Sequence, residues 1–141
     1  MSSRATQLQP AVDQARQRSE DALAQLALRQ QQLAKAEHQL AELQRYRHEY
    51  AMGGDGSLTV SGLLNRQKFV ERIDQAIAQQ TAEIARLQSQ FELVRDGWQQ
   101  AHARESALDS VVEGYRTEER RAESRREQAE SDERMQYRRS R

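Results

Sequence analysis

The feature that most constrains the fold of this chain is a run of apolar residues spaced alternately three and four residues apart. The pattern is clearest between residues 70 and 115, where two series of positions recur every seven residues. The first series is Val70, Ile77, Ile84, Phe91, Trp98, Glu105 and Val112, and the second is Ile73, Gln80, Leu87, Val94, Ala101, Leu108 and Tyr115. Such a heptad repeat predicts an α-helix whose apolar stripe faces another helix in a coiled coil.

A weaker repeat of the same kind occupies the first half of the chain. Its two series are Val12, Ser19, Leu26, Leu33, Leu40 and Arg47, and Ala15, Ala22, Arg29, Ala36, Leu43 and Tyr50. A lone helix cannot bury a narrow apolar stripe, so each of the two predicted helices needs a partner. The nearest partner for each stripe is the other stripe of the same chain.

A glycine-rich segment, GGDG at residues 53–56, separates the two repeats. Gly and Asp accept the turn conformations that end a helix and reverse the chain. Thr59 is suited to cap the next helix, with Leu58 and Leu63 as the apolar pair of a hydrophobic staple. The sequence therefore predicts an all-α fold, a long antiparallel two-helix coiled coil (α-hairpin) in a single domain. Helix one should run from about residue 10 to about 51, the glycine loop over 53–57, and helix two from about 60 to about 130, followed by a polar C-terminal tail.

The two predicted helices differ in length, so the second should overhang the first. Counting outward from the loop places Leu40 opposite Val70 and Val12 opposite Trp98. On this register the apolar residues that follow Trp98 have no counterpart on helix one. They are Leu108, Val111, Val112 and Tyr115. An uncovered apolar segment of this kind indicates a partner.

Composition excludes several classes of function. Of the 141 residues 36% are hydrophobic and 31% charged, and 22 basic side chains balance 22 acidic ones. A formal net charge of zero gives no global attraction for nucleic acid or anionic lipid. The absence of cysteine excludes disulfides and thiol catalysis, and no apolar run is long enough to cross a bilayer. We therefore expect a cytoplasmic protein.

The residues that could carry chemistry favour no enzyme, cofactor or metal site. His38, His48 and His102 lack the i, i+4 spacing that puts two imidazoles on one helical face, and no acidic ligand cluster converges on them. The GGDG segment lacks the Lys-Ser/Thr that follows a phosphate-binding loop. We therefore expect a protein that acts by binding other proteins.

The segment after Tyr115 contains no Leu, Ile, Val or Phe and carries nine Arg against seven acidic residues. It is either a solvated helix supported by intrahelical ion pairs or a segment that a partner orders. Nucleic acid is a poor partner for it, because an excess of two positive charges releases few counterions.

Aromatic residues cluster on either side of the predicted loop. Tyr46 lies off the seam of helix one, and Phe69 lies one residue before the seam position Val70. Large apolar side chains at such places either pack over the flank of a coiled coil or bind a partner. They belong to two stripes with i, i+4, i+7, i+11 spacing, Gln39, Leu43, Tyr46 and Tyr50 on helix one and Phe69, Ile73, Ala76 and Gln80 on helix two.

In these residues the sequence resembles the FliJ family of flagellar export proteins. The resemblance covers nearly the whole chain and rests on the order and spacing of several segments. They are LQPAVDQA (8–15), LQRYRHEY (43–50), the glycine loop, LLNRQKFVERIDQAI (63–77), VRDGW (94–98) and EERRAESRREQAESDE (118–133).

The resemblance implies a coiled-coil stalk, similar to the central stalk of rotary ATPases, at the cytoplasmic face of the flagellar type III export apparatus. It implies the export ATPase FliI and the export gate protein FlhA as partners, with export chaperones as further candidates. The gate-binding face would comprise Gln39, Leu43, Tyr46, Tyr50, Phe69, Ile73, Ala76 and Gln80. The overhanging Leu108, Val112 and Tyr115 would meet the ATPase ring. Two alternatives stay open, the equivalent stalk of a virulence injectisome and a generic structural coiled-coil scaffold that self-associates.

Overall fold

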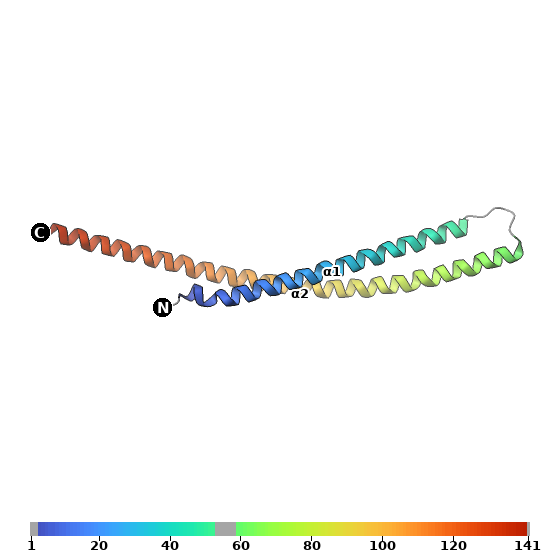
Figure 1. Ribbon diagram of the computed structural model, residues 1–141, viewed down its shortest axis with the longest axis horizontal. Helices are drawn as coiled ribbons and strands as arrows, with labels where there is room; N and C mark the ends of the chain where they lie inside the picture. The colour runs from blue at the N-terminus through green and yellow to red at the C-terminus, as the bar shows by residue number, and fades with distance from the viewer. Residues whose placement is uncertain (1–2, 53–58, 141) are drawn as a thin grey trace. The chain divides into compact units, whose positions relative to one another are not determined.

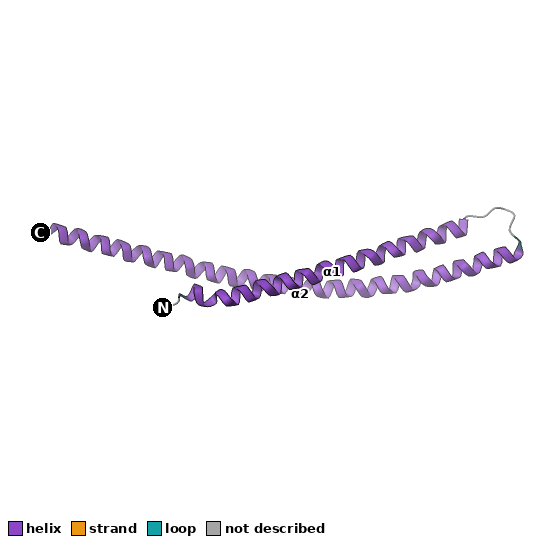
Figure 2. Ribbon diagram, in the orientation of Figure 1, coloured by secondary structure: helices purple, strands orange, loops and turns teal. Residues whose placement is uncertain are grey.

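The fold consists of two long α-helices. The computed structural model describes residues 3–52 and 59–140, in which α1 spans Arg4–Met52, α2 spans Val60–Arg139 and no strand occurs (Figures 1 and 2). The two helices pack against each other, so the predicted all-α helical hairpin is confirmed. The glycine loop and Leu58 of the predicted staple lie outside the described residues.

The chain divides into two compact units. The central unit is Ala22–Trp98, and the terminal unit combines Met1–Asp21 with Gln99–Arg141. In the central unit Tyr50 lies against Phe69 and Arg29 binds Gln90, so the helices run antiparallel there.

The terminal unit is antiparallel as well. Gln9 near the start of α1 accepts a hydrogen bond from Arg116, and Arg16 reaches back to Glu105 on α2.

The predicted heptad positions form the seam between the helices. Every position of the two series from Val70 to Tyr115 is buried or partly buried, and so is every position from Val12 to Leu43 on α1. Arg47 and Tyr50, the last members of the α1 series, are exposed. The seam also extends upstream, because Ala5 is 3% exposed and Leu8 is partly buried.

α1 begins at Arg4, before the start expected at about residue 10, and therefore contains Pro10. Ser3 caps it, since its Oγ accepts a hydrogen bond from the Thr6 backbone N–H at 3.1 Å. A proline inside a helix removes one backbone hydrogen bond and costs about 3 kcal/mol. Pro10 is exposed, while Ala5 and Leu8 are covered by α2, and this burial offsets the cost of continuing the helix past it.

α2 begins where the sequence predicts. The Thr59 Oγ1 accepts a hydrogen bond from the Gly62 backbone N–H at 3.2 Å, and the Thr59 carbonyl accepts one from Leu63 at 3.0 Å. These are the two bonds of an N-cap residue, so the predicted cap is confirmed. At its other end α2 continues to Arg139, further than expected, so the charged segment after Tyr115 is helical as far as that residue.

Replacing Thr59 by Ala should lower the free energy of unfolding by about 1 kcal/mol, because the Gly62 N–H loses its acceptor at the start of α2. Urea denaturation followed by circular dichroism measures the change. Ser61→Ala is the matched control, and loss of this exposed hydroxyl should change stability by less than about 0.5 kcal/mol. Equal effects of the two substitutions would show that Thr59 does not cap the helix.

The register of the helices differs from the one counted outward from the loop. In the central unit Asp74 pairs with Arg47, and the Gln80 side chain donates to the Ala36 carbonyl at 2.9 Å. The predicted pairing of Leu40 with Val70 is therefore wrong. The first turns of α2 extend past the paired region, and Val60 and Leu64 are 75% and 53% exposed. Counting from the loop failed because it assumed that pairing starts at the first residue of α2.

Candidate partner-binding surfaces

Tyr50 and Phe69 form an exposed aromatic pair in the central unit. Their ring centroids are 4.5 Å apart with the planes inclined at 43°, and the residues are 45% and 42% exposed. Tilted rings at this separation stabilise each other by an electrostatic attraction that adds to the stabilisation from the apolar area they bury. Each ring restricts the other, so the pair offers a rigid apolar surface. Beside it lies a hollow of ≈ 520 Å³ lined by Glu49, Asn65 and Arg66 as well as the two rings.

Tyr46 lies one helical turn from Tyr50 and is 43% exposed. The Arg45 guanidinium lies 5.4 Å from the centroid of its ring, which is the geometry of a cation–π contact. Next to it Arg47 donates hydrogen bonds to Asp74 across the seam, and this contact raises the pKa of Arg47. An arginine is charged at any physiological pH, so this ion pair helps to hold the register beside the aromatic residues.

The remaining members of the predicted gate-binding set have different environments. Ile73 is 8% exposed, and Leu43 and Ala76 are partly buried, so these three pack in or beside the seam. Gln80 donates to the Gln39 side chain at 3.2 Å. The structure therefore brings the two predicted stripes together, with the aromatic rings exposed, the aliphatic residues packed and the two glutamines paired. Their role in binding stays a prediction.

A polar groove that includes Gln39 and Gln80 lies between the helices, and the sequence did not predict it. It is a hollow of ≈ 410 Å³ in the central unit, with Ala36 and Leu87, 4% and 8% exposed, among its lining. Its other lining residues are Arg29, Gln32, Lys35, Gln39, Gln80, Glu83, Arg86 and Gln90. The signal that could have found it is spacing, because Gln32, Ala36 and Gln39 continue the stripe of Leu43 and Tyr46.

The core of the terminal unit contradicts the prediction that the overhang of the second helix contains Leu108, Val112 and Tyr115, although α2 does continue past the start of α1 to Arg139. Val12 and Val112 are 2% and 4% exposed and pack with Ala5, and Leu108 and Tyr115 pack against this cluster. Leu108, Val112 and Tyr115 are thus covered by α1 and not left beyond its start. The prediction was wrong for two physical reasons: the register is displaced, and α1 begins at Arg4, so its first turns reach this part of α2.

Polar contacts surround this terminal core. Arg16 lies 3.8 Å from the carboxylates of both Glu105 and Asp109, and the Glu105 side chain is only 16% exposed. The Arg4 guanidinium lies 5.7 Å from the centroid of the Tyr115 ring. An ion pair at a half-buried seam position has little net effect on stability but disfavours registers that would leave the carboxylate unpaired.

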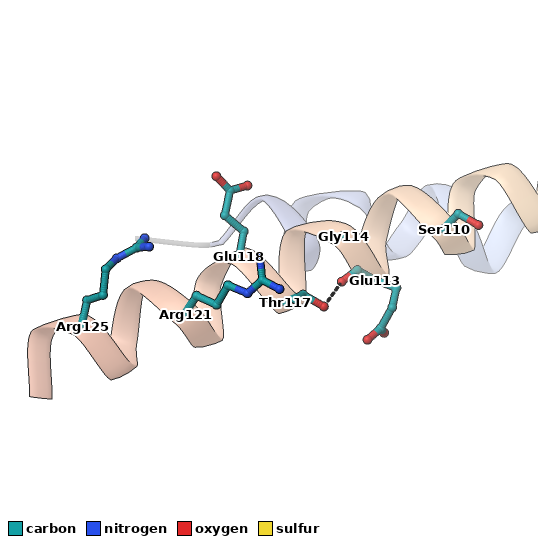
Figure 3. Close-up of a pocket in the computed structure, with 7 residues that line it drawn as sticks. All are labelled: Ser110, Glu113, Gly114, Thr117, Glu118, Arg121 and Arg125. Atoms are coloured by element: carbon teal, nitrogen blue, oxygen red, sulfur yellow. Dashed lines mark hydrogen bonds between the residues drawn. The ribbon is translucent and has the colours of Figure 1, made fainter. Parts of the chain in front are cut away.

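Another hollow lies on the outer face of α2 in the terminal unit (Figure 3). Its lining residues are Ser110, Glu113, Gly114, Thr117, Glu118, Arg121 and Arg125. Thr117 donates its hydroxyl to the Glu113 carbonyl at 2.9 Å, and open space surrounds Gly114. Arg121 and Arg125 line the same hollow, and neither forms an ion pair within residues 3–52 and 59–140. Val111 is 48% exposed. Val111, Arg121 and Arg125 are exposed and Val112 is buried, and the predicted contact of Leu108, Val112 and Tyr115 with an ATPase ring stays a prediction.

The histidines lie on the surface. His38 and His102 are each within 4 Å of a glutamate on the same helix, at 3.8 and 3.7 Å, and His48 is exposed. In the described part of the chain no three His, Asp or Glu side chains are grouped so that they could hold a metal ion. Neither described helix has a stretch apolar enough to cross a membrane.

Comparison with protein families decides the relationship of this chain. The family model described as "Flagellar FliJ protein" matches residues 3–141, nearly the whole length. The chain belongs to the FliJ family. As a FliJ family protein it is related to flagellar export, and this favours the flagellar interpretation over the injectisome alternative. No curated protein and no solved structure matches the chain closely enough to compare.

Proposed function

We propose that this FliJ family protein is a coiled-coil stalk that links the export ATPase ring of FliI to the export gate protein FlhA and promotes export of flagellar subunits. The observation that carries the proposal is the exposed pair Tyr50–Phe69 beside Tyr46, a rigid aromatic surface that the hairpin itself does not cover. Aromatic residues of this kind are the usual anchors of protein interfaces. The gate protein would bind here.

The terminal unit would engage the ATPase ring. Because Leu108, Val112 and Tyr115 pack against α1, their part in this contact is to hold the two helices together. The groups that remain available are Val111, Arg121, Arg125 and the helix after residue 122, in which every described side chain is exposed. A surface that carries both positive and negative charges suits contact with the interior of a ring, because it does not hold the stalk tightly in one orientation relative to the ring.

Affinity capture with the purified full-length chain tests the proposal. The chain should retain both FliI and the cytoplasmic domain of FlhA, each in the absence of the other. A generic coiled-coil scaffold would retain neither and would instead self-associate, which analytical ultracentrifugation of the isolated chain detects. Retention of neither partner would contradict the proposed function.

Truncation after Ala122 should weaken the contact with the ATPase and leave the contact with the gate protein intact. The truncated chain keeps the terminal core and the hydrogen bond that the Ala5 backbone N–H donates to the Glu119 carboxylate, so its thermal midpoint should change by less than about 3 °C. Stimulation of the ATPase should fall severalfold because the exposed tail is lost, while gate binding should be unchanged.

Arg121 and Arg125 provide the second variant for this test. Replacing both by Gln in the full-length chain removes the two unpaired guanidinium groups and leaves the tail in place. If this variant and the truncated chain both stimulate the ATPase as well as the full-length protein, the terminal unit is not the ATPase-binding surface.

A further inference from the structure

The polar groove continues the flank of the coiled coil that carries the aromatic pair. On α1, Gln32, Ala36 and Gln39 precede Leu43 and Tyr46 with the same alternating spacing of four and three residues. On α2, Gln80 is followed by the groove residues Glu83, Leu87 and Gln90 in the same pattern. Residues spaced in this way lie on one face of a helix. The aromatic pair and the polar groove therefore share one face of the central unit, and Gln39 and Gln80 are the groove residues nearest to the aromatic pair along α1 and α2.

Two positive charges in the groove have no counter-charge among the residues that the structure describes. Arg29 donates only to neutral amides, to Gln32 at 3.3 Å and to Gln90 at 2.9 Å. Lys35 forms no ion pair with any residue in 3–52 or 59–140.

The third cation of the groove is neutralised. The Arg86 guanidinium donates to both carboxylate oxygens of Glu83, and this hydrogen bonding lowers the pKa of Glu83. Glu83 thus stays ionised and is already paired. The groove has an excess of two positive charges in a chain whose formal net charge is zero.

The amides of the groove suit the backbone of another protein. Four glutamines line it, and within the described residues the Nε2 groups of Gln32, Gln39 and Gln90 donate no hydrogen bond and the Oε1 of Gln80 accepts none, so the groove offers both donors and an acceptor. A peptide backbone presents the same two groups and needs both satisfied when it is covered. Nucleic acid is a poorer occupant, because two cations release few counterions and no aromatic side chain lines the groove for base stacking.

We propose that the polar groove binds an acidic stretch of the same protein that docks on the aromatic pair. Tyr50 and Lys35 are separated by roughly 22 Å along α1 at the rise of an α-helix. The partner must then carry an apolar anchor for Tyr50 and Phe69 and one or more carboxylates roughly 22 Å away. This inference rests on the proposed gate contact for the identity of the partner, but not for the chemistry of the groove.

The test replaces Lys35 in the full-length chain. Lys35→Glu should weaken binding of the FlhA cytoplasmic domain about tenfold and reduce the dependence of the affinity on salt, whereas Lys35→Arg should retain wild-type affinity. Arg104→Glu is the matched control, an exposed cation of the terminal unit with the same change in net charge. Circular dichroism confirms that all three variants fold. Equal affinity of Lys35→Glu and Arg104→Glu for the gate would overturn the proposal.

Synthetic peptides separate a failure of the groove from a failure of the proposed function. The probe is a labelled 16-residue peptide with a Leu-Leu anchor at one end and four Glu at the other, and its control has Gln in place of Glu. The Glu peptide should bind the wild type several times more tightly than Lys35→Glu, and the Gln peptide should not distinguish them. If the wild type does not bind FlhA, the proposed function fails. In that case the comparison of the Glu and Gln peptides alone tests whether the groove binds acidic residues. Equal binding of the Glu peptide to both proteins, or tighter Lys35-dependent binding of oligothymidylate, would overturn the proposal.

Discussion

Replacing Val112 by Asp should unfold the terminal unit and leave the central unit folded. Val112 is 4% exposed and packs against Val12 and Ala5, so the new carboxylate would be buried in an apolar cluster. An uncompensated buried charge costs about 3 to 5 kcal/mol. Amide hydrogen exchange measures the local stability of each unit separately. Protection should be lost in residues 3–21 and 99–122 but kept in residues 22–98.

Val111→Asp is the control for this experiment. Val111 is the adjacent residue, of the same type, and is 48% exposed, so the carboxylate stays hydrated and stability should change by less than about 0.5 kcal/mol. The pair of substitutions distinguishes the observed register from an overhang, in which both valines would be exposed. Equal and small effects at the two positions would show that α1 does not cover this part of α2.

Replacing Phe69 or Tyr50 by Ala should lower the affinity for the gate protein about 30-fold each. An aromatic anchor that is fully desolvated in a complex contributes roughly 2 kcal/mol or more to binding. Both rings are more than 40% exposed in the free chain, so the cost in folding stability should stay below about 1 kcal/mol. Isothermal titration calorimetry with the FlhA cytoplasmic domain measures the affinity, and Tyr46→Ala should weaken it in the same direction.

Two controls make this result specific. Leu93→Ala removes a side chain that is 72% exposed elsewhere in the central unit and should leave gate binding unchanged. The Tyr50→Ala/Phe69→Ala double variant should lose less than the sum of the single losses, because the rings are 4.5 Å apart and each loses its support when the other is removed. Normal gate binding by folded single variants would mean that the rings only pack against each other.

The heptad repeat was sufficient to predict the two helices and the seam between them. Each position from Val70 to Tyr115 in the two series is buried or partly buried, although Glu105 and Gln80 interrupt the apolar pattern. The prediction succeeded because helical periodicity is a local property, set by 3.6 residues per turn. The cap at Thr59 was predictable for the same reason, since an N-cap involves only the next three residues.

The candidate gate-binding surface was predictable in part. The two stripes are brought together on one flank, but only Tyr46, Tyr50, Phe69 and Gln39 are exposed. Ile73 is buried because it also belongs to the second heptad series, whose positions face α1, so the repeat predicted its burial. The polar groove was not predicted because Arg29 is a polar member of the seam series, and Lys35 and Arg86 belong to neither heptad series nor to the aromatic stripes.

The sequence alone determined that this protein is a pair of helices that pack along their heptad positions, and only the tertiary structure decided which residues of the two helices meet. A heptad repeat leaves the register undetermined, because a slip of seven residues returns every seam position to the seam. The slip is resolved by contacts between distant parts of the chain, such as Gln80 with the Ala36 carbonyl and Val12 with Val112. A buried polar group needs a hydrogen-bond partner and a core must be closely packed, and the observed alignment meets both requirements at these positions.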